Sequence, residues 1–454
     1  MKYCAAISLL FSLASGVFAQ TLPRLNVSPL SNQHVVVSWP YTNAGFTFEE
    51  AKALASTNWQ ASVLVPAFDS NHAMFSASVS ASNVARFFRL KQPSDLRGIY
   101  VCSEALPLSK NNSNALVAAF SVPGVDGLVL GLGWTNLETN LNQFAWGDLD
   151  TWMSHAVAAN LKVDLSLRAG NLTPAWLFAP RTNGGVGATP LTFSYSPQDG
   201  KTTNCQVETI AAPWDTNFLG AWDSMLGAVS AHLKTKGSYE ALKLVRLTGI
   251  NRNTAELHLP SQTSTNTGLD CVSNAPAIWQ AAGYTPSNLL SGWSNILLSF
   301  QTHFPDKSFS VAIIALTNNN PFPPINDCGM ITNVLGADQN FPLLSLASQM
   351  LQGRLVIQNN SLYPERAAMP QTVSSAQSLG TLIAFQTNEQ GPGSSADCNG
   401  TCSNANYLAM LETGIYPLLQ TNSLRAQYIE IFPADANAFT NAIWQAHSEL
   451  FEGL

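Results

Sequence analysis

Apolar and polar positions follow two alternating patterns from residue 97 to the end of the chain. Short runs rich in Val, Leu, Ile and Phe alternate with longer stretches in which apolar residues recur at three- and four-residue steps. In residues 289–304, for example, Trp293, Leu297 and Phe300 fall on one face of a helix. Near-continuous apolar strands that alternate with helices predict a parallel sheet covered on both faces.

The strand-like runs number eight. They read RGIYVC (97–102), DGLVLGLGW (126–134), LKVDLSLRAG (161–170), LKLVRLTGI (242–250), FSVAIIAL (309–316), RLVIQNN (354–360), LIAFQTNE (382–389) and YIEIFPA (428–434). Eight strands of this kind predict an α/β protein with a closed (β/α)₈ TIM barrel rather than an open doubly wound sheet. The first run is not followed by the G-x-G-x-x-G of a dinucleotide-binding sheet, which favours the same conclusion.

A different pattern occupies residues 20–93, where short alternating segments such as HVVVSWP and ARFFRL are separated by Asn, Ser, Gly and Pro. This spacing predicts a small antiparallel β-sandwich. The segment resembles an N-terminal β-sandwich module found on secreted bacterial proteins, including polysaccharide-degrading enzymes. Trp39, Trp59 and Phe87 could stack on a sugar, but a role in the core is favoured. The barrel is expected to span residues 94–454.

The first twenty residues, MKYCAAISLLFSLASGVFAQ, have a lysine, an apolar stretch and small residues before a cleavage point. They predict a signal peptide over residues 1–19 and a secreted or periplasmic protein. Six cysteines follow Cys4, and an even count in an exported chain favours disulfide bonds, with CNGTC (398–402) as a candidate for a local one.

Composition narrows the range of partners. Only 11% of residues are charged, the formal net charge is −7, and no run of Lys or Arg occurs. Nucleic acid and anionic membranes are therefore poor candidates. The chain has no paired C-x-x-C spacing for zinc and no nucleotide-binding motif, so no metal and no cofactor is expected.

The candidate chemistry lies where the strands end, because active sites of TIM barrels form at the C-terminal ends of the strands. Glu256 follows the fourth run and Glu389 ends the seventh. Hydrolysis of a glycosidic bond needs two carboxyl groups, one to protonate the leaving oxygen and one to attack the anomeric carbon or to activate water. The substrate-binding side chains expected around this pair are Trp134, Arg168, Asn171, Trp176, Asn251, Asn253, His258, Asn359, Asn388 and Glu430. Indole rings stack on sugars and amides bind hydroxyl groups.

Glutamates after the fourth and seventh strands resemble the clan A (4/7) retaining glycoside hydrolases, a superfamily of (β/α)₈ barrels. The resemblance covers residues 97–454. It implies a carbohydrate substrate, Glu256 as the acid/base and Glu389 as the nucleophile. Clan members usually have Asn directly before the acid/base, whereas this chain has Ala255.

Other interpretations of these residues stay open. Glu389 could cap a loop or pair with Arg168, and Glu256 could begin an ordinary solvated turn. His258 suits a structural or rim position, and each Trp could be core. A non-catalytic carbohydrate-binding protein on the same barrel is the alternative function, and Ala255 is its best support.

Overall fold

The structure is a computed structural model of the chain. It describes residues 25–31, 34–40, 47–53, 59–62, 64, 67–69, 74–80, 86–91, 95–106, 110–195, 206–251, 255–257, 259, 275–313, 341–351, 353–362, 370–387, 403–417 and 424–451. The predicted signal peptide, residues 1–19, lies outside these ranges. No helix within them is both long and apolar enough to cross a bilayer.

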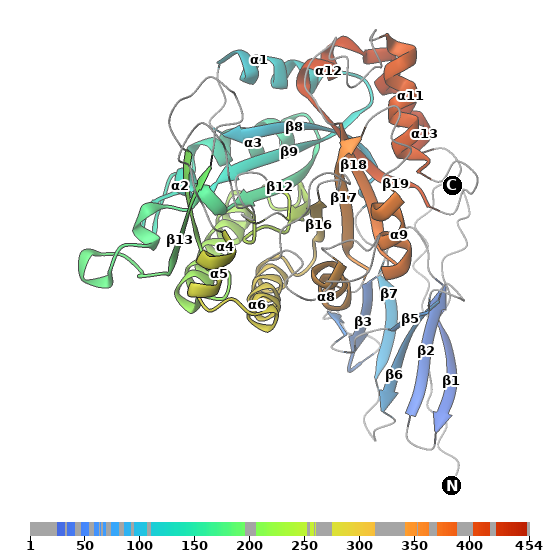
Figure 1. Ribbon diagram of the computed structural model, residues 1–454. Coiled ribbons are helices and arrows are strands. Elements are labelled where there is room, and N and C mark those ends of the chain that lie inside the picture. Colours follow the sequence, from blue (N-terminus) through green and yellow to red (C-terminus); the bar gives the residue numbers. More distant parts are fainter. Residues whose placement is uncertain are drawn as a thin grey trace.

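Eight parallel strands close into a barrel (Figure 1). In chain order they are β8 (Gly98–Leu106), β9 (Val125–Gly133), β12 (Lys162–Arg168), β15 (Leu242–Arg246), β16 (Ser308–Ile313), β17 (Leu355–Leu362), β18 (Leu382–Thr387) and β19 (Ala426–Ile431). Each strand pairs with the next, and β19 returns to β8, with Glu430 opposite Tyr100. Each of the eight predicted runs contributes one of these strands, so the predicted TIM barrel is confirmed.

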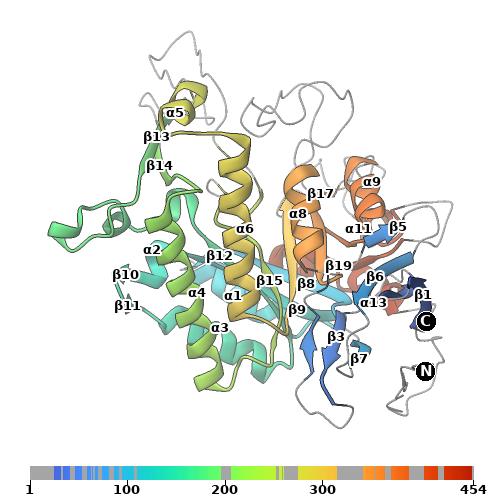
Figure 2. The same cartoon turned by 90° about the horizontal axis from the view of Figure 1, so that it is seen from below.

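Helices surround the barrel (Figure 2). The outward side chains of the strands pack with those of the helices in one hydrophobic cluster. They are α1 (Lys110–Ala119), α2 (Trp134–Leu137), α3 (Gly147–Ala158), α4 (Thr216–Lys236), α5 (Ala275–Ala281), α6 (Pro286–His303), α8 (Phe341–Leu351), α9 (Pro370–Leu379), α11 (Asn404–Ile415), α12 (Pro433–Ala438) and α13 (Thr440–Phe451). The main hydrophobic core lies between the two layers, where Leu165, Ile357 and Ile429 are fully buried. Burial on both faces explains why the strands read as nearly continuous apolar runs.

Helix α4 illustrates how local sequence sets the helix ends. The carboxylate of Asp215 accepts hydrogen bonds from the backbone N–H groups of Asn217 (2.8 Å) and Phe218 (3.0 Å), which caps the first turn. Burial alone would raise the pKa of Asp215. Hydrogen bonds from Thr189 and from these N–H groups lower the pKa by more than that, so it lies below its usual value. Gly237 ends the helix with a φ of 72°, a conformation that glycine adopts without strain.

The long connection between β12 and β15 contains α4 and a short hairpin. Three single-turn 3₁₀ helices come first: η1 (Gly170–Leu172), η2 (Ala175–Leu177) and η3 (Arg181–Asn183). The hairpin pairs β13 (Pro190–Tyr195) with β14 (Gln206–Ala211) in antiparallel register. A second small hairpin, of β10 (Glu138–Asn140) and β11 (Gln143–Phe144), follows β9.

Two small antiparallel sheets precede the barrel and lie at the lower right in Figure 1. One has the order β1 (Asn26–Ser31), β2 (His34–Pro40), β6 (Met74–Ser80), β5 (Ala67–Asp69); the other has β4 (Gln60–Ala61), β3 (Thr47–Ala51), β7 (Phe87–Lys91). Trp39 of the first sheet stacks on Phe48 of the second at 4.8 Å between ring centroids. Both rings are buried, so the antiparallel module is confirmed and Trp39 belongs to its core. Trp59 instead carries the Arg89 guanidinium on its face.

The interior of the barrel is crowded beside β9. Gly127 lies opposite Tyr100 of β8, and a Cβ atom at Gly127 would be 2.4 Å from Cδ1 of the tyrosine ring. Cys102 on the same strand as Tyr100 is a buried thiol. The even number of cysteines therefore does not mean that all six form disulfides. The other five lie outside the described residues.

Candidate active site in the barrel

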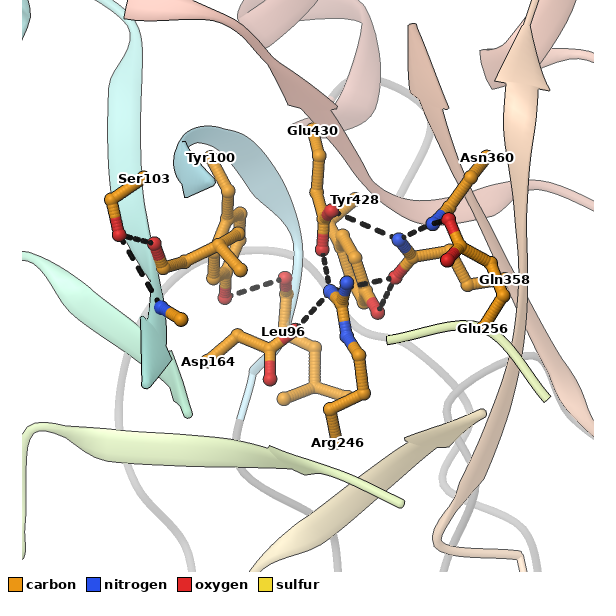
Figure 3. A network of polar contacts seen from close by, with 12 residues as sticks. Leu96, Tyr100, Ser103, Asp164, Arg246, Glu256, Gln358, Asn360, Tyr428 and Glu430 are labelled. Atoms are coloured by element: carbon orange, nitrogen blue, oxygen red, sulfur yellow. Dashed lines mark hydrogen bonds and ion pairs between the residues drawn. The ribbon is translucent and has the colours of Figure 1, made fainter. Parts of the chain in front are cut away.

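Four polar side chains point into the barrel from four of its strands (Figure 3). They are Asp164 of β12, Arg246 of β15, Gln358 of β17 and Glu430 of β19, and all are at most 3% exposed. Side chains alternate between the two faces of a strand, so each of these residues faces inward while its neighbours pack against helices. Hydrogen bonds and ion pairs connect the four into one network.

Arg246 is the centre of this network. Its Nη2 atom donates to Asp164 Oδ2 at 2.7 Å, to Glu430 Oε1, and to Gln358 Oε1 at 3.2 Å. Burial disfavours the charged guanidinium, but attraction to the Glu430 and Asp164 carboxylates outweighs burial and holds the pKa of Arg246 well above its usual value. Arg246 is therefore a permanent buried cation.

The two oxygens of Glu430 have partners on different strands. Oε1 accepts from Arg246, and Oε2 accepts from Nε2 of Gln358 at 2.9 Å. Burial raises the pKa of Glu430 to about 7, although the attraction of Arg246 opposes this shift. Side chains of the barrel interior thus hold both oxygens of Glu430.

Tyr428 joins the network from the same strand as Glu430. Its hydroxyl donates to Oε1 of Gln358 at 2.6 Å. Burial, together with the negative charges of Asp164 and Glu430, raises the pKa of Tyr428 well above its usual value. The hydroxyl thus stays protonated and remains a donor.

Glu256 lies at the C-terminal end of the barrel. The chain leaves β15 after Arg246 and returns beside β16, where Glu256 forms a parallel bridge with Ala312, the penultimate residue of that strand. Nδ2 of Asn360 donates to Glu256 Oε1 at 2.7 Å, and Oδ1 of Asn360 accepts from Gln358 Nε2 at 2.7 Å. Oε2 of Glu256 is buried and has no hydrogen-bond partner among the described residues. Asn360 therefore holds one oxygen of the Glu256 carboxyl group, and the other oxygen has no partner among the described residues.

Neighbouring amides of β17 point in opposite directions. Asn359 faces outward and donates from Nδ2 to Thr372 Oγ1 of α9 at 3.0 Å. Its side chain is fully buried between strand and helix, so it does not reach the interior, in contrast to the sequence-based expectation. Asn360 is the amide that faces the site, because the strand period of two reverses the direction at each residue.

The tryptophans expected near a sugar are engaged in packing. Trp134 is 1% exposed, and its Nε1–H donates to Glu138 Oε2 at 2.8 Å. Trp176 is half-buried against it edge to face, with ring centroids 5.7 Å apart, and donates to the backbone carbonyl of Glu138 at 3.0 Å. The buried indole of Trp134 offers no free face for stacking, so the structure gives it a packing role.

The remaining candidates divide into described and undescribed residues. Arg168 ends β12 as a buried side chain on the same face as Asp164, Asn251 is buried with Oδ1 accepting from the Gly249 N–H at 2.9 Å, and Asn171 is exposed in η1. Glu389, Asn388, Asn253 and His258 lie outside the described residues, and β18 ends two residues before Glu389. The structure thus brings together Glu256 and Glu430, through Asn360 and Gln358.

Sequence reasoning missed Asp164, Arg246, Gln358 and Asn360. A signal was present: Asp164 and Arg246 are each a charged residue between apolar neighbours, as in VDL and VRL, and Gln358 follows the apolar residues LVI directly. Buried polar side chains need partners, so isolated ones on several strands of one barrel indicate a shared interior network.

No group of three His, Cys, Asp or Glu side chains in the described part of the chain is arranged to hold a metal ion. The polar residues that do converge are one cation, three carboxylates and two amides, a set suited to proton transfer and to binding hydroxyl groups.

The fold and this network define a (β/α)₈ barrel with a candidate active site at the C-terminal end of its strands. The structure is similar to the catalytic domain of a β-amylase from Paenibacillus polymyxa, with a TM-score of 0.50 and 12% identity over 78% of this chain and 98% of that chain. It is also similar to a β-galactosidase from Marinomonas ef1 (TM-score 0.46, 10% identity, 78% of this chain and 62% of that chain). An intracellular xylanase from Thermoanaerobacterium saccharolyticum follows with a TM-score of 0.43 and 14% identity over 75% and 86% of the two chains.

At these identities the similarity concerns the fold alone. No protein-family model matches the chain, and no curated protein matches it. Solved structures with this fold thus include glycoside hydrolases, while the assignment of residues to roles depends on the site itself.

Proposed function

We propose that the protein is a secreted glycoside hydrolase that cleaves a poly- or oligosaccharide by a retaining mechanism, with Glu256 as the acid/base and Glu389 as the nucleophile. The observation that carries the proposal is the state of the Glu256 carboxyl group. It lies at the C-terminal end of the barrel with Oε1 held by Asn360 and Oε2 without a described partner. An acid/base needs a fixed orientation and one oxygen that no protein group already holds.

Two further observations support a glycosidase. The barrel has the fold of a β-amylase catalytic domain. Glu389 comes two residues after the end of β18, the seventh barrel strand, and Glu256 follows the fourth, as the resemblance to clan A requires. A retaining mechanism would place the two carboxyl groups about 5–5.5 Å apart, and an inverting one roughly 6.5–9.5 Å.

The test is hydrolysis of a panel of aryl glycosides and plant or algal polysaccharides by the wild type and by single variants. Glu256→Gln is expected to lower kcat/KM about 10²–10⁴-fold, because general acid catalysis contributes this much. Glu389→Gln should abolish turnover. Glu240→Gln, which changes an exposed glutamate, is the matched control and should leave kcat/KM unchanged. NMR of the first-formed product should show the same anomeric configuration as the substrate.

A non-catalytic carbohydrate-binding protein is the second candidate, and Ala255 in the place of the usual Asn favours it. Binding of oligosaccharides by calorimetry, with no hydrolysis of any substrate in the panel, would support this candidate and contradict the first.

A further inference from the structure

The side-chain amides of Gln358 and Asn360 lie between Arg246 and Glu256. The hydrogen bonds fix which end of each amide is the oxygen and which is the nitrogen. The guanidinium of Arg246 can only donate, and the Tyr428 hydroxyl also donates, so the atom of Gln358 that receives both is its carbonyl oxygen. Nε2 of Gln358 must then be the atom that faces Glu430 and Asn360. A flip of the Gln358 amide would place N–H groups against Arg246.

The orientation of Gln358 fixes that of Asn360 in turn. Because Gln358 Nε2 is a donor, its partner on Asn360 is Oδ1, at 2.7 Å, and Nδ2 of Asn360 is left to face Glu256. The buried cation thus imposes one direction on the whole series of hydrogen bonds (Figure 3). The series ends as an N–H donor directed at Glu256 Oε1.

This donor distinguishes the two oxygens of Glu256. An oxygen that accepts an N–H bond at 2.7 Å cannot also carry a proton directed at the same nitrogen. A carbonyl oxygen accepts such a bond better than a hydroxyl oxygen does, so in the neutral acid this contact favours Oε1 as the carbonyl oxygen and the proton on Oε2, which is buried without a described partner.

We propose that Asn360 and Gln358 are positioning residues that make Oε2 of Glu256 the oxygen that delivers the proton. The inference rests on the proposed glycosidase function. In the first step the Oε2 proton moves to the glycosidic oxygen as the bond from that oxygen to the anomeric carbon breaks. The electron pair of the broken bond stays on the leaving oxygen, and the Glu389 carboxylate forms the new bond to the anomeric carbon.

The second step reverses these roles. Water attacks the anomeric carbon and gives its proton to Oε2, while the bond to Glu389 breaks and returns the electron pair to that carboxylate. Oε1 accepts from Asn360 throughout, so Glu256 keeps its orientation in both protonation states.

Kinetics with two leaving groups test the positioning role. A phenyl leaving group needs protonation, whereas 2,4-dinitrophenolate leaves without it. For Asn360→Ala, kcat/KM should fall about 10²-fold on the phenyl glycoside, because misplacement of a catalytic group has effects of this size. It should fall less than about tenfold on the dinitrophenyl glycoside, for which the acid contributes little. Equal losses on both substrates would overturn the proposal.

Thr372→Val is the matched control, since it removes the partner of the outward-facing Asn359 on the same strand. It should lower stability without changing the ratio of the two kcat/KM values. Asn360→Asp provides a second variant of nearly the same shape that replaces the donor by a carboxylate, and it should show the same leaving-group dependence as Asn360→Ala.

A crystal structure of Asn360→Ala tests the inference without activity. The Glu256 carboxyl group should rotate away from its wild-type orientation, and an unchanged orientation would contradict the inference. Absence of hydrolysis by the wild type on every glycoside would instead contradict the proposed function, and the crystal structure would still decide the role of Asn360.

Discussion

Glu430 and Glu256 belong to the same hydrogen-bonded series but lie in different regions of the barrel. Glu430 is in the middle, fully buried, with Arg246 on one oxygen and Gln358 on the other. Glu256 is at the C-terminal end, half-buried, with one oxygen held by Asn360 and the other without a described partner.

The difference separates a structural carboxylate from a candidate reactive one. Both are glutamates on a network that starts at the same cation, so residue type and proximity to charge do not distinguish them. Position and partners do: both oxygens of Glu430 are hydrogen-bonded in the middle of the barrel, whereas Oε2 of Glu256, at its C-terminal end, has no partner among the described residues. Three experiments test this difference.

The largest effect is expected from Arg246→Met. Removal of the cation leaves Asp164 and Glu430 buried together without their shared partner, which typically costs about 3–5 kcal/mol of stability. Urea unfolding would measure the loss. The control is Lys236→Met, which breaks the exposed pair with Asp150 (3.1 Å) and should cost no more than about 1 kcal/mol. Equal losses for both variants would mean that the buried ion pairs of Arg246 contribute no more to stability than the exposed pair of Lys236 and Asp150.

The second effect is a pH dependence of stability that comes from Glu430. Its pKa is raised from 4.5 to about 7 in the folded protein, so between these values the folded state binds more protons than the unfolded state. Stability from this group is complete below pH 4.5 and is lost as the pH rises toward 7, by at most roughly 3 kcal/mol at 1.36 kcal/mol per pKa unit. Unfolding free energies of the wild type and Glu430→Gln should therefore differ in slope over this range. Parallel curves would show that Glu430 does not titrate there.

The smallest effect concerns Trp134, which the structure places in packing rather than in substrate binding. Trp134→Phe removes the donor to the buried Glu138 carboxylate and should cost about 1–3 kcal/mol. Trp444→Phe, at an indole that is 54% exposed, should stay within about 0.5 kcal/mol of the wild type. An increase of KM in Trp134→Phe without loss of stability would mean that Trp134 binds the substrate, as the sequence predicts.

The barrel could be predicted from the sequence because a strand that is buried on both faces is a nearly continuous run of apolar residues. Every run that reads as a buried strand, from RGIYVC to YIEIFPA, is a strand of the closed sheet. The direction of individual side chains was harder to predict. When both faces of a strand are buried, polarity does not show which face is inside, and Asn359 and Asn360 could not be separated.

The position of Glu256 depends on a contact that no local pattern encodes. Glu256 forms a bridge with Ala312, near the end of β16, and lies beside Asn360 of β17. The polar residues of the interior could have been found from the sequence, since Asp164, Arg246 and Glu430 are each a charged residue between apolar neighbours. Their pairing required knowledge of the closed barrel.

The close approach of Gly127 to Tyr100 has a consequence for engineering this scaffold. A side chain at position 127 would overlap the tyrosine ring, so any single substitution there is expected to be rejected, even Gly127→Ala. A smaller residue at position 100 would remove the overlap. A library that varies one site at a time will therefore score position 127 as invariant, whereas a library that varies positions 127 and 100 together can find combinations that reshape the inside of the barrel.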